Sequence, residues 1–442
     1  MRKKNLPHFT PLIRLSIILT ASIVTAKCCY GYIHTCLWLM MGTSCFFACI
    51  FSDTNYSFIR TFSHARTRES KGLLQSYGIY TCVFLVGCLL TSHEIDLQMS
   101  ESESTEVVSS QSLSTFDHAY LAVKDAQIHV KQLLQELGIK DQNYAVITAM
   151  TLGDKTAVTP ETKDIYSISG ASHVLAISGL HIGIIFQLFI LAFGGRKRHS
   201  VPTLFFSLTA IWAYVFFIGF PASAVRSANM ISICSFAILA HREALSLNNL
   251  AFAYCLMLTL HPLYLFDISF QMSFLAIGFI LLLMPIFRKA VNIPNKWLRW
   301  TYNMVCLSVA AQIGTTPIIA YYFGRISCYS LLTSFIAIPA ATLILYLSAG
   351  LLFSCALSSL CGMICTSDFT WATGLATTLM KWIANGLINI TEVCNSTLQL
   401  CTLLPKASIE GIQINIPQLC LIYIGIIAGY IFIRRLRQFR SP

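Results

Sequence analysis

The 442-residue chain is 55% hydrophobic and only 11% charged, and its mean hydropathy is +0.67. Soluble domains carry about 25% charged residues, so this composition excludes an ordinary water-soluble globular protein. The formal net charge of +11 does not by itself indicate a nucleic-acid partner. Lysine and arginine also accumulate on the cytoplasmic loops of membrane proteins.

Apolar runs long enough to cross a bilayer recur along the whole chain. Taking the basic clusters between them as cytoplasmic gives twelve predicted spans, with both termini inside. The predicted spans are 11–27, 31–51, 75–92, 173–194, 201–219, 224–240, 248–262, 268–287, 300–323, 328–354, 372–392 and 417–433. We therefore expect an all-α polytopic membrane protein with about 10–12 transmembrane helices.

The connection after the third predicted span has a distinct composition. Residues 93–117 are rich in acidic and polar side chains and contain no lysine or arginine, which predicts a disordered extracytoplasmic linker. Residues 118–138 have an amphipathic pattern, so we expect a helix lying on the outer membrane surface or against the bundle. The predicted divisions are N-terminal spans 1–92, acidic linker 93–117, amphipathic helix and lead-in 118–172, membrane core 173–355, and C-terminal spans with a basic cytoplasmic tail 356–442.

Polar residues within the predicted spans are not scattered. Such residues are costly in lipid and usually face the interior of a helix bundle. Here they fall in four segments at the predicted outer ends of spans, and their shared depth favours a polar, water-accessible pathway that opens outward. The candidate pathway residues are His173, Ser178, His181, Arg226, Asn229, Asp267, Gln271, Gln312 and Arg325.

The segment 173–194 is predicted to be one continuous helix with two distinct faces. Gly179 and Gly183 form a GxxxG stripe that suits close helix packing. Ser178 and the two histidines fall on a neighbouring arc. The histidines have three interpretations: interhelical hydrogen bonding, pathway lining, or catalysis. Catalysis by Ser178 requires a base within about 2.6–3.2 Å, and a three-residue offset on one helix makes that geometry awkward.

Glycine and proline are expected to shape two other polar segments. Residues 219–230 begin with Gly219 and Pro221, which predict a hairpin turn, with Ser223 as the N-cap of the next helix. Gly314 and Pro317 are expected to break the span that contains them and to expose backbone groups that need partners.

Several charged and aromatic side chains have structural alternatives to a pathway role. Arg226 either faces the pathway or pairs with Asp267. Four aromatic residues either stack on nucleotide bases or pack as ordinary core and lipid-facing residues; they are Phe220, Phe270, Phe274 and Tyr322. No CxxC pairs with another CxxC or with a histidine cluster, so we expect no zinc site, and we expect no cofactor.

Five motifs occur in the order seen in one known family: TLGDK at 151–155, GASHVLAISGLHIG, GFPASAVRSANM, DISFQMSFLA and AAQIGTTPIIAYYFGRIS. Over roughly residues 115–350 the chain resembles the membrane core of the ComEC competence-protein family. The resemblance implies a channel in the bacterial cytoplasmic membrane that admits single-stranded DNA during natural transformation, and we expect this chain not to be an enzyme. Arg226 and Arg325 would then attract phosphates, and the neutral polar candidates would offer exchangeable hydrogen bonds.

The chain departs from longer members of that family. They often carry an OB-like domain between the early spans and the core, where this chain has only residues 93–172, whose first part is acidic. Many also carry a C-terminal metallo-β-lactamase-like domain, whereas this chain contains no HxH motif. It also contains no P-loop. The expected partners are therefore a DNA receptor, a separate nuclease, and a cytoplasmic motor or single-strand-binding proteins.

Two alternative functions remain open at this point. A small-molecule or anion transporter would use the same polar pathway, with the predicted helix break at Gly314 and Pro317 as its binding region. An intramembrane hydrolase would use Ser178 and His181.

Overall fold

A computed structural model describes most of the chain. The described residues are 11–32, isolated positions from 35 to 41, 67–104, 115–194, 200–240, 246–291, 293–364 and 370–440. Most of the predicted span 31–51 lies outside them. The chain forms two compact units, and each is described separately. Unit 1 comprises Met1–Ser112 and Leu245–Phe274, and unit 2 comprises Leu113–Ala244 and Leu275–Pro442.

The described chain is predominantly helical, and seven helices are long and apolar enough to cross a membrane. They lie in α1 (Pro11–Cys29), α3 (Thr67–Ser104), α10 (Ala222–Leu239), α12 (Ile268–Ala290), α13 (Lys296–Phe323), α14 (Ser330–Ile364) and α16 (Ile416–Arg440). The shorter apolar helices are α8 (Gly179–Gly194), α9 (Val201–Phe217) and α11 (Leu247–Leu260). The prediction of an all-α polytopic membrane protein is confirmed. Its orientation and the location of its termini stay predictions.

Two local expectations differ from the structure. Residues 93–104 are not an unstructured linker, because α3 continues through them to Ser104. Extending an existing helix adds one hydrogen bond per residue without a new nucleation step. The predicted span 372–392 lies in α15 (Thr370–Thr402), which is absent from the seven apolar helices found among the described residues. Lys381 and Glu392 make α15 amphipathic, and it packs along α14.

Unit 1 is built on α1, α3 and α11, with the short 3-10 helix η1 (Pro262–Phe266) beside them. A Cβ at Gly87 would collide with the Ser22 hydroxyl, so the absence of a side chain lets α1 and α3 approach closely. The rings of Tyr254, Phe270 and Phe274 pack together in tilted and edge-to-face arrangements, and both phenylalanines are buried. These two rings therefore pack in the core and are not available to stack on bases.

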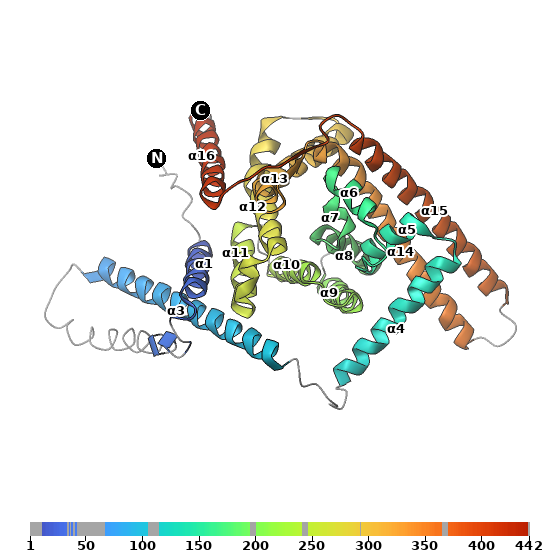
Figure 1. The fold of residues 1–442 in the computed structure, drawn as a ribbon, viewed down its shortest axis with the longest axis horizontal. Helices are drawn as coiled ribbons and strands as arrows, with labels where there is room; N and C mark the ends of the chain where they lie inside the picture. The colour runs from blue at the N-terminus through green and yellow to red at the C-terminus, as the bar shows by residue number, and fades with distance from the viewer. Residues whose placement is uncertain are drawn as a thin grey trace. The chain divides into compact units, whose positions relative to one another are not determined.

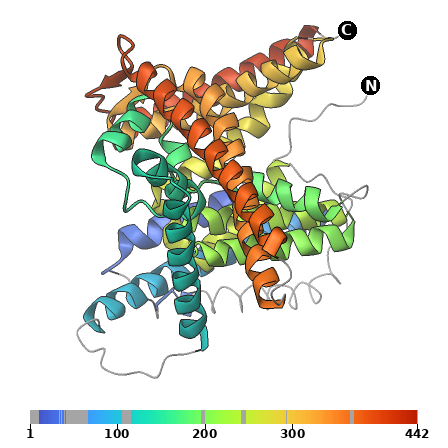
Figure 2. The same ribbon diagram turned by 90° about the vertical axis from the view of Figure 1, so that its right-hand side faces the viewer.

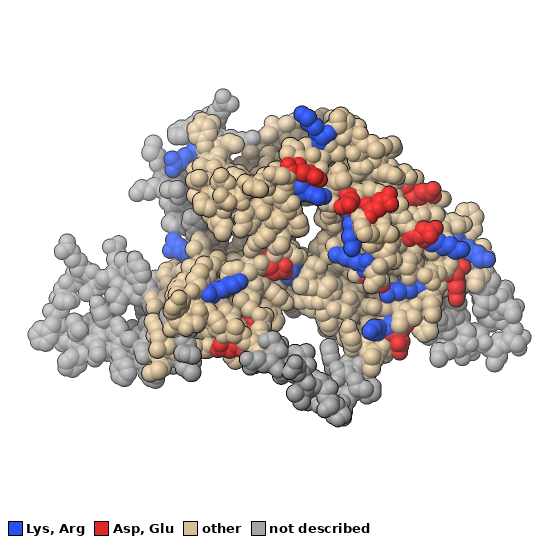
Figure 3. Space-filling model, viewed as in Figure 1, with Lys and Arg blue, Asp and Glu red and all other residues tan. Residues whose placement is uncertain are grey.

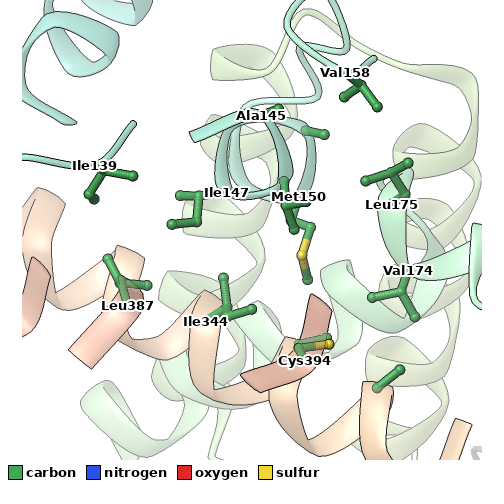
Figure 4. Close-up of a cluster of buried hydrophobic side chains, with 14 of the residues drawn as sticks. Ile139, Ala145, Ile147, Met150, Val158, Val174, Leu175, Ile344, Leu387 and Cys394 are labelled. Carbon is green, nitrogen blue, oxygen red and sulfur yellow. The ribbon is translucent and has the colours of Figure 1, made fainter. Parts of the chain in front are cut away.

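The main core of unit 2 surrounds α14 and α15, which run side by side (Figures 1 and 2). Three short helices pack near them: α5 (Asp141–Thr151), α6 (Pro160–Ile168) and α7 (Ser172–Leu175). Met150, Val174, Ile344 and Leu387 illustrate the buried cluster that joins these elements (Figure 4). Apolar burial thus fixes the short helices that lead into the polar segments.

The predicted amphipathic helix is present as α4 (Thr115–Glu136). Leu134 is buried and Val130 packs against the main core of unit 2. Gln127 donates a side-chain hydrogen bond to the Phe217 carbonyl of α9. The apolar face of α4 therefore lies against the bundle. Charged side chains of both signs gather over the α4, α5 and α6 part of the surface, whereas much of the remaining described surface in the same view is uncharged (Figure 3).

A second core cluster joins α8, α9 and α10 to α14 through residues such as Ile182, Ile211 and Leu345. The only regular sheet among the described residues is a short antiparallel pair, β1 (Arg325–Ser327) and β2 (Ser408–Glu410). Its register places Arg325 opposite Glu410, and it fixes the segment that follows α13.

Candidate functional site

The polar segment 169–193 contains a broken helix. The short α7 ends at Leu175, Ala176 adopts an extended conformation with φ −111° and ψ 147°, and α8 begins at Gly179. The expectation of one continuous helix over 173–194 is therefore wrong. Ser223 of α10 stabilises the break, because its hydroxyl donates a 2.6 Å hydrogen bond to the Ile177 carbonyl.

The break separates the two histidines that a continuous helix would place on one arc. His173 lies in α7, where its Nδ1 is 3.2 Å from the Gly170 carbonyl oxygen. His181 lies in the first turn of α8 and is fully buried. Its Nδ1 lies 2.9 Å from the Ser178 hydroxyl and 3.4 Å from the Ser178 backbone nitrogen.

Ser178 and His181 form a local arrangement that resembles a capping box. In that motif the third residue of a helix reaches back to the backbone N–H of the N-cap residue. The expectation of an awkward offset is wrong, because Ser178 precedes α8 and its hydroxyl comes within hydrogen-bond distance of the imidazole. The arrangement has a structural explanation, since it pairs polar groups at the start of a helix where backbone N–H groups lack helical partners.

The two glycines of the predicted GxxxG stripe have different environments. A Cβ at Gly179 would lie 2.9 Å from the Ser227 hydroxyl of α10, so α8 and α10 approach closely there. A Cβ at Gly183 would have no atom within 4 Å. Both glycines lie in α8, but among the described residues only Gly179 closely approaches another helix, so the stripe does not form one continuous packing surface.

The predicted hairpin between α9 and α10 is present, and its backbone explains its composition. Gly219 has φ +81° and Phe220 has φ +52°, a conformation that glycine adopts readily and that other residues rarely adopt. The N-cap of α10 is Pro221, so the prediction that Ser223 caps this helix is wrong. The Ser223 hydroxyl instead contacts the break between α7 and α8.

The polar residues that follow on α10 extend inward from this hairpin. Arg226 is 1% exposed and is the largest fully buried side chain among the described residues. It lies one turn beyond Ser223, and Asn229, another turn along, is half-buried. Asp267 and Gln271 belong to unit 1, so the alternative pairing of Arg226 with Asp267 stays a prediction.

Within unit 1, Asp267 and Gln271 make local contacts at the start of α12. The Asp267 carboxylate accepts a 3.0 Å hydrogen bond from the Ser269 backbone N–H. The Gln271 side-chain amide donates to the Leu265 carbonyl at 2.8 Å. Both residues therefore organise the turn between η1 and α12.

The helix α13 continues through Gly314 and Pro317, so the predicted break there is wrong. Gly314 permits close packing with α12, because a Cβ would lie 2.9 Å from the Leu275 carbonyl oxygen. The Tyr423 hydroxyl of α16 donates a 2.8 Å hydrogen bond to the Gly314 carbonyl. The Gly314 carbonyl, close to Pro317, thus has a hydrogen-bond partner outside α13, although the helix itself is continuous. Gln312, two residues before Gly314, is half-buried.

Arg325 lies just beyond the end of α13. Gly324 terminates the helix in the left-handed conformation, with φ +64°, and Arg325 begins β1. The Arg325 guanidinium donates to the Ser167 hydroxyl at 3.0 Å and lies 3.6 Å from the Glu410 carboxylate. These two contacts hold the arginine fork in a defined orientation.

Arg325 lines a cleft of about 440 Å³ that also reaches the helix break at Ala176. Its lining includes three cations and one carboxylate, together with hydroxyl donors. The lining residues are Lys155, Val158, Lys163, Asp164, Ser167, Ser172, Leu175, Ala176, Phe323 and Arg325. We call this cavity the Arg325 cleft. Its chemistry suits weak binding of an anion, because lysine, arginine and serine all donate hydrogen bonds to phosphate or carboxylate oxygens.

The comparison with known families identifies the chain. A family model described as Competence protein matches residues 150–436, which is more than half of the sequence. The chain belongs to the Competence family. The matched range contains the helix break, the α9–α10 hairpin, α13 and the whole lining of the Arg325 cleft. The family resemblance expected from the motifs is confirmed.

Relatives of this Competence-family chain include two curated proteins with informative names. It is 27% identical over 299 residues to ComE operon protein 3 of Bacillus subtilis, covering 66% of this chain and 36% of that protein. It is 24% identical over 212 residues to Recombination protein 2 of Haemophilus influenzae, covering 45% and 27% respectively. An uncharacterized protein of Aquifex aeolicus is 28% identical over 189 residues, 42% of each chain. No solved structure matches.

Sequence reasoning identified Arg325 in this Competence-family core but missed the groups around it. Lys155, Lys163 and Ser167 all lie in the lead-in 118–172, where the sequence indicated no candidate site residue. Of the three, only Lys155 belongs to a recognised motif, TLGDK. Lys163 and Ser167 belong to none. Both lie in α6: Ser167 accepts a hydrogen bond from the Arg325 guanidinium, and Lys163 lines the same cleft. A search for cations within the five motifs would have found Lys155, whereas Lys163 has no local signal.

Proposed function

We propose that this Competence-family chain forms the membrane core of a channel for single-stranded DNA in natural transformation. The Arg325 cleft is the observation that carries the proposal. It brings Lys155, Lys163 and Arg325 around one cavity beside a break in an apolar segment. The chain matches only 36% of the length of ComE operon protein 3. The activity of the complete system is therefore a proposal for this chain.

The chemistry of the Arg325 cleft suits transient contact with a DNA backbone. Each nucleotide carries one phosphate charge, and the three cations attract it without recognising the base. Glu410 offsets part of the Arg325 charge at 3.6 Å, and Asp164 adds a second negative group to the rim. The site therefore attracts a phosphate but holds it weakly, which is what movement along a pathway requires.

The helix break offers the next step of the proposed path. Ala176 lines the Arg325 cleft, and Ser223 contacts the adjacent Ile177 carbonyl. Arg226 lies one turn further along α10 and is buried. We propose that Arg226 provides a second cationic position, reached after the phosphate leaves the cleft. Under the predicted topology, the cleft opens to the outside of the cytoplasmic membrane.

A salt titration tests the binding step. For single strands the logarithm of the affinity falls with the logarithm of salt concentration, with a slope of about −0.7 per neutralised phosphate. Three cations therefore give a slope of about −2 for a labelled oligonucleotide binding the purified full chain. The Lys155→Gln/Lys163→Gln variant should lower the affinity at least tenfold and reduce the slope by more than half.

Transformation in a competent host tests the function. A deletion strain would be complemented with wild type, Lys155→Gln/Lys163→Gln, Arg226→Ala and a matched control, each checked for equal membrane abundance. The control is Lys124→Gln/Lys140→Gln, which removes two exposed unit 2 lysines that do not line the Arg325 cleft. We expect at least a tenfold loss for the cleft variant and for Arg226→Ala, and no loss for the control. Unchanged transformation with purified DNA in the deletion strain would refute the proposal.

The second candidate function is a small-molecule or anion transporter. The break between α7 and α8 favours it, because transporters commonly bind substrates where membrane helices are interrupted. Liposomes containing the full chain distinguish the candidates. Uptake of labelled phosphate without dependence on DNA, combined with normal transformation of the deletion strain, would support the transporter.

We propose that the chain acts as a conduit and not as an enzyme. The hydrogen bond between Ser178 and His181 is accounted for by the start of α8. A fluorophosphonate probe should therefore leave Ser178 unlabelled, and labelling abolished by Ser178→Ala would revive the hydrolase alternative. The DNA receptor, the nuclease and the motor or single-strand-binding proteins are proposed as separate partners, and no cofactor is proposed.

A further inference from the structure

The turn that joins α12 to α13 is strongly cationic. It is flanked by Arg288 and Lys289 on one side and by Lys296 and Arg299 on the other. The sequence contains no aspartate or glutamate between Asp267 and Asp368. Among the residues that the structure describes, neither arginine has an ion-pair partner. The positive charge of this turn is thus not neutralised within its own helices.

Two of these cations line a small cavity, which we call the Arg288 cleft. It has a volume of about 260 Å³ and is lined by Arg288, Val291, Ile293, Arg299, Tyr302 and Asn303. The Tyr302 hydroxyl donates a 2.9 Å hydrogen bond to the Phe287 carbonyl, which ties α13 to the end of α12. The cleft therefore presents two guanidinium groups and one amide on a fixed helical pair, a donor set that matches phosphate oxygens.

Neighbouring side chains place the Arg288 cleft at the level of lipid headgroups. Both α12 and α13 are candidate membrane spans, so the turn between them lies at a membrane surface. Trp297 and Trp300 are 81% and 50% exposed. Tryptophan is enriched at the boundary between lipid and water. Exposed apolar residues beside a cationic pocket suit a ligand that has both a phosphate and an acyl portion.

We propose that the Arg288 cleft binds the phosphate of an anionic phospholipid. Basic pockets between transmembrane helices commonly recognise such headgroups. The apolar rim favours lipid over a nucleic-acid strand, because exposed Trp297, Leu298 and Val291 would otherwise face water around a passing DNA. The site is also separate from the Arg325 cleft. They lie at opposite ends of α13, whose 28 residues extend about 42 Å.

Lipid retention by the purified full chain tests this site. Delipidated protein would be given phosphatidylglycerol or phosphatidylcholine in detergent, and bound lipid would be counted by native mass spectrometry at high ionic strength. Salt screens exposed charges that only contribute to general attraction. The test variant is Arg288→Gln/Arg299→Gln. The matched control is Lys289→Gln/Lys296→Gln, which removes the same charge from the same turn but from residues outside the cleft lining.

We expect wild type to prefer phosphatidylglycerol, the arginine variant to lose at least tenfold in its affinity, and the lysine control to change by less than threefold. The substituted side chains are exposed, and size-exclusion profiles would show that both variants fold. Equal losses in the two variants would overturn the proposal by assigning the effect to diffuse charge. Equal retention of both lipids by wild type would also overturn it.

Competition distinguishes the lipid from other sources of phosphate. Millimolar inorganic phosphate and a labelled oligonucleotide would each be added to the lipid-loaded protein. Persistence of phosphatidylglycerol supports the proposal. Displacement by inorganic phosphate would overturn it in favour of a free-anion site, and displacement by the oligonucleotide would overturn it in favour of a second DNA contact.

Discussion

Replacing Gly314 by alanine should destabilise the packing of α12 on α13. The added Cβ would lie 2.7 Å from Phe279 Cδ2 and 2.9 Å from the Leu275 carbonyl oxygen, whereas ordinary contacts are 3.4–4 Å. The carbonyl belongs to the backbone, so the helices must separate or bend to relieve the overlap. Overpacking costs about 1–3 kcal/mol. Replacing a glycine in a helix interior by alanine stabilises the helix by about 0.5–1 kcal/mol, which leaves a net loss of up to about 2.5 kcal/mol.

Gly183→Ala provides a matched control with the opposite expected sign. Its Cβ would meet no atom within 4 Å, so only the helical gain of about 0.5–1 kcal/mol remains. Both variants would be unfolded with sodium dodecyl sulfate in mixed micelles, beside wild type and at constant detergent composition. Equal effects from the two substitutions, or a stabilised Gly314→Ala variant, would refute the close approach of α12 and α13.

Three further expectations concern polar contacts in unit 2. Tyr423→Phe should lose about 1 kcal/mol in the same titration, because it removes the 2.8 Å hydrogen bond to a carbonyl of α13. Ser223→Ala should lose about 1–2 kcal/mol, since its 2.6 Å bond supports the α7–α8 break; Ser227→Ala, whose hydroxyl only bonds within its own helix, should lose less. Burial would raise the pKa of Asp154, but hydrogen bonds from Lys131 and Thr156 lower it overall. The ion pair therefore stabilises the fold above the ordinary pKa of 3.8, and its roughly 0.2–1 kcal/mol should be lost as pH falls below that value. Asp154→Asn should remove this acid sensitivity.

The fold class and most helix positions could be predicted from local composition. An apolar run of sufficient length becomes a helix in lipid, because every backbone polar group must be paired within the segment. That rule holds for α12, α13 and α16 without reference to their neighbours. It fails to predict where a helix ends in a polar region. Residues 93–104 continue α3 even though their composition resembles that of a flexible linker.

The candidate site was predicted only in part. Arg325 stood out because it lies with other polar residues at the predicted outer end of a span. Lys163 could not be selected, because its place beside Arg325 depends on the packing of α6. The position of the helix break was also misjudged. Proline suggested a break in α13, but the helix accommodates Pro317 while Tyr423 binds a nearby carbonyl.

The sequence by itself determined the membrane character of the chain, its order of apolar helices and its membership of the Competence family. These properties depend on composition and on motif order, which are local. Only the tertiary structure decided that the 173–194 segment breaks at Ala176, that Ser223 supports the break, and that Lys155, Lys163 and Arg325 surround one cleft. Such features depend on side chains from distant segments satisfying backbone groups and charges, and no periodic pattern along the chain records that pairing.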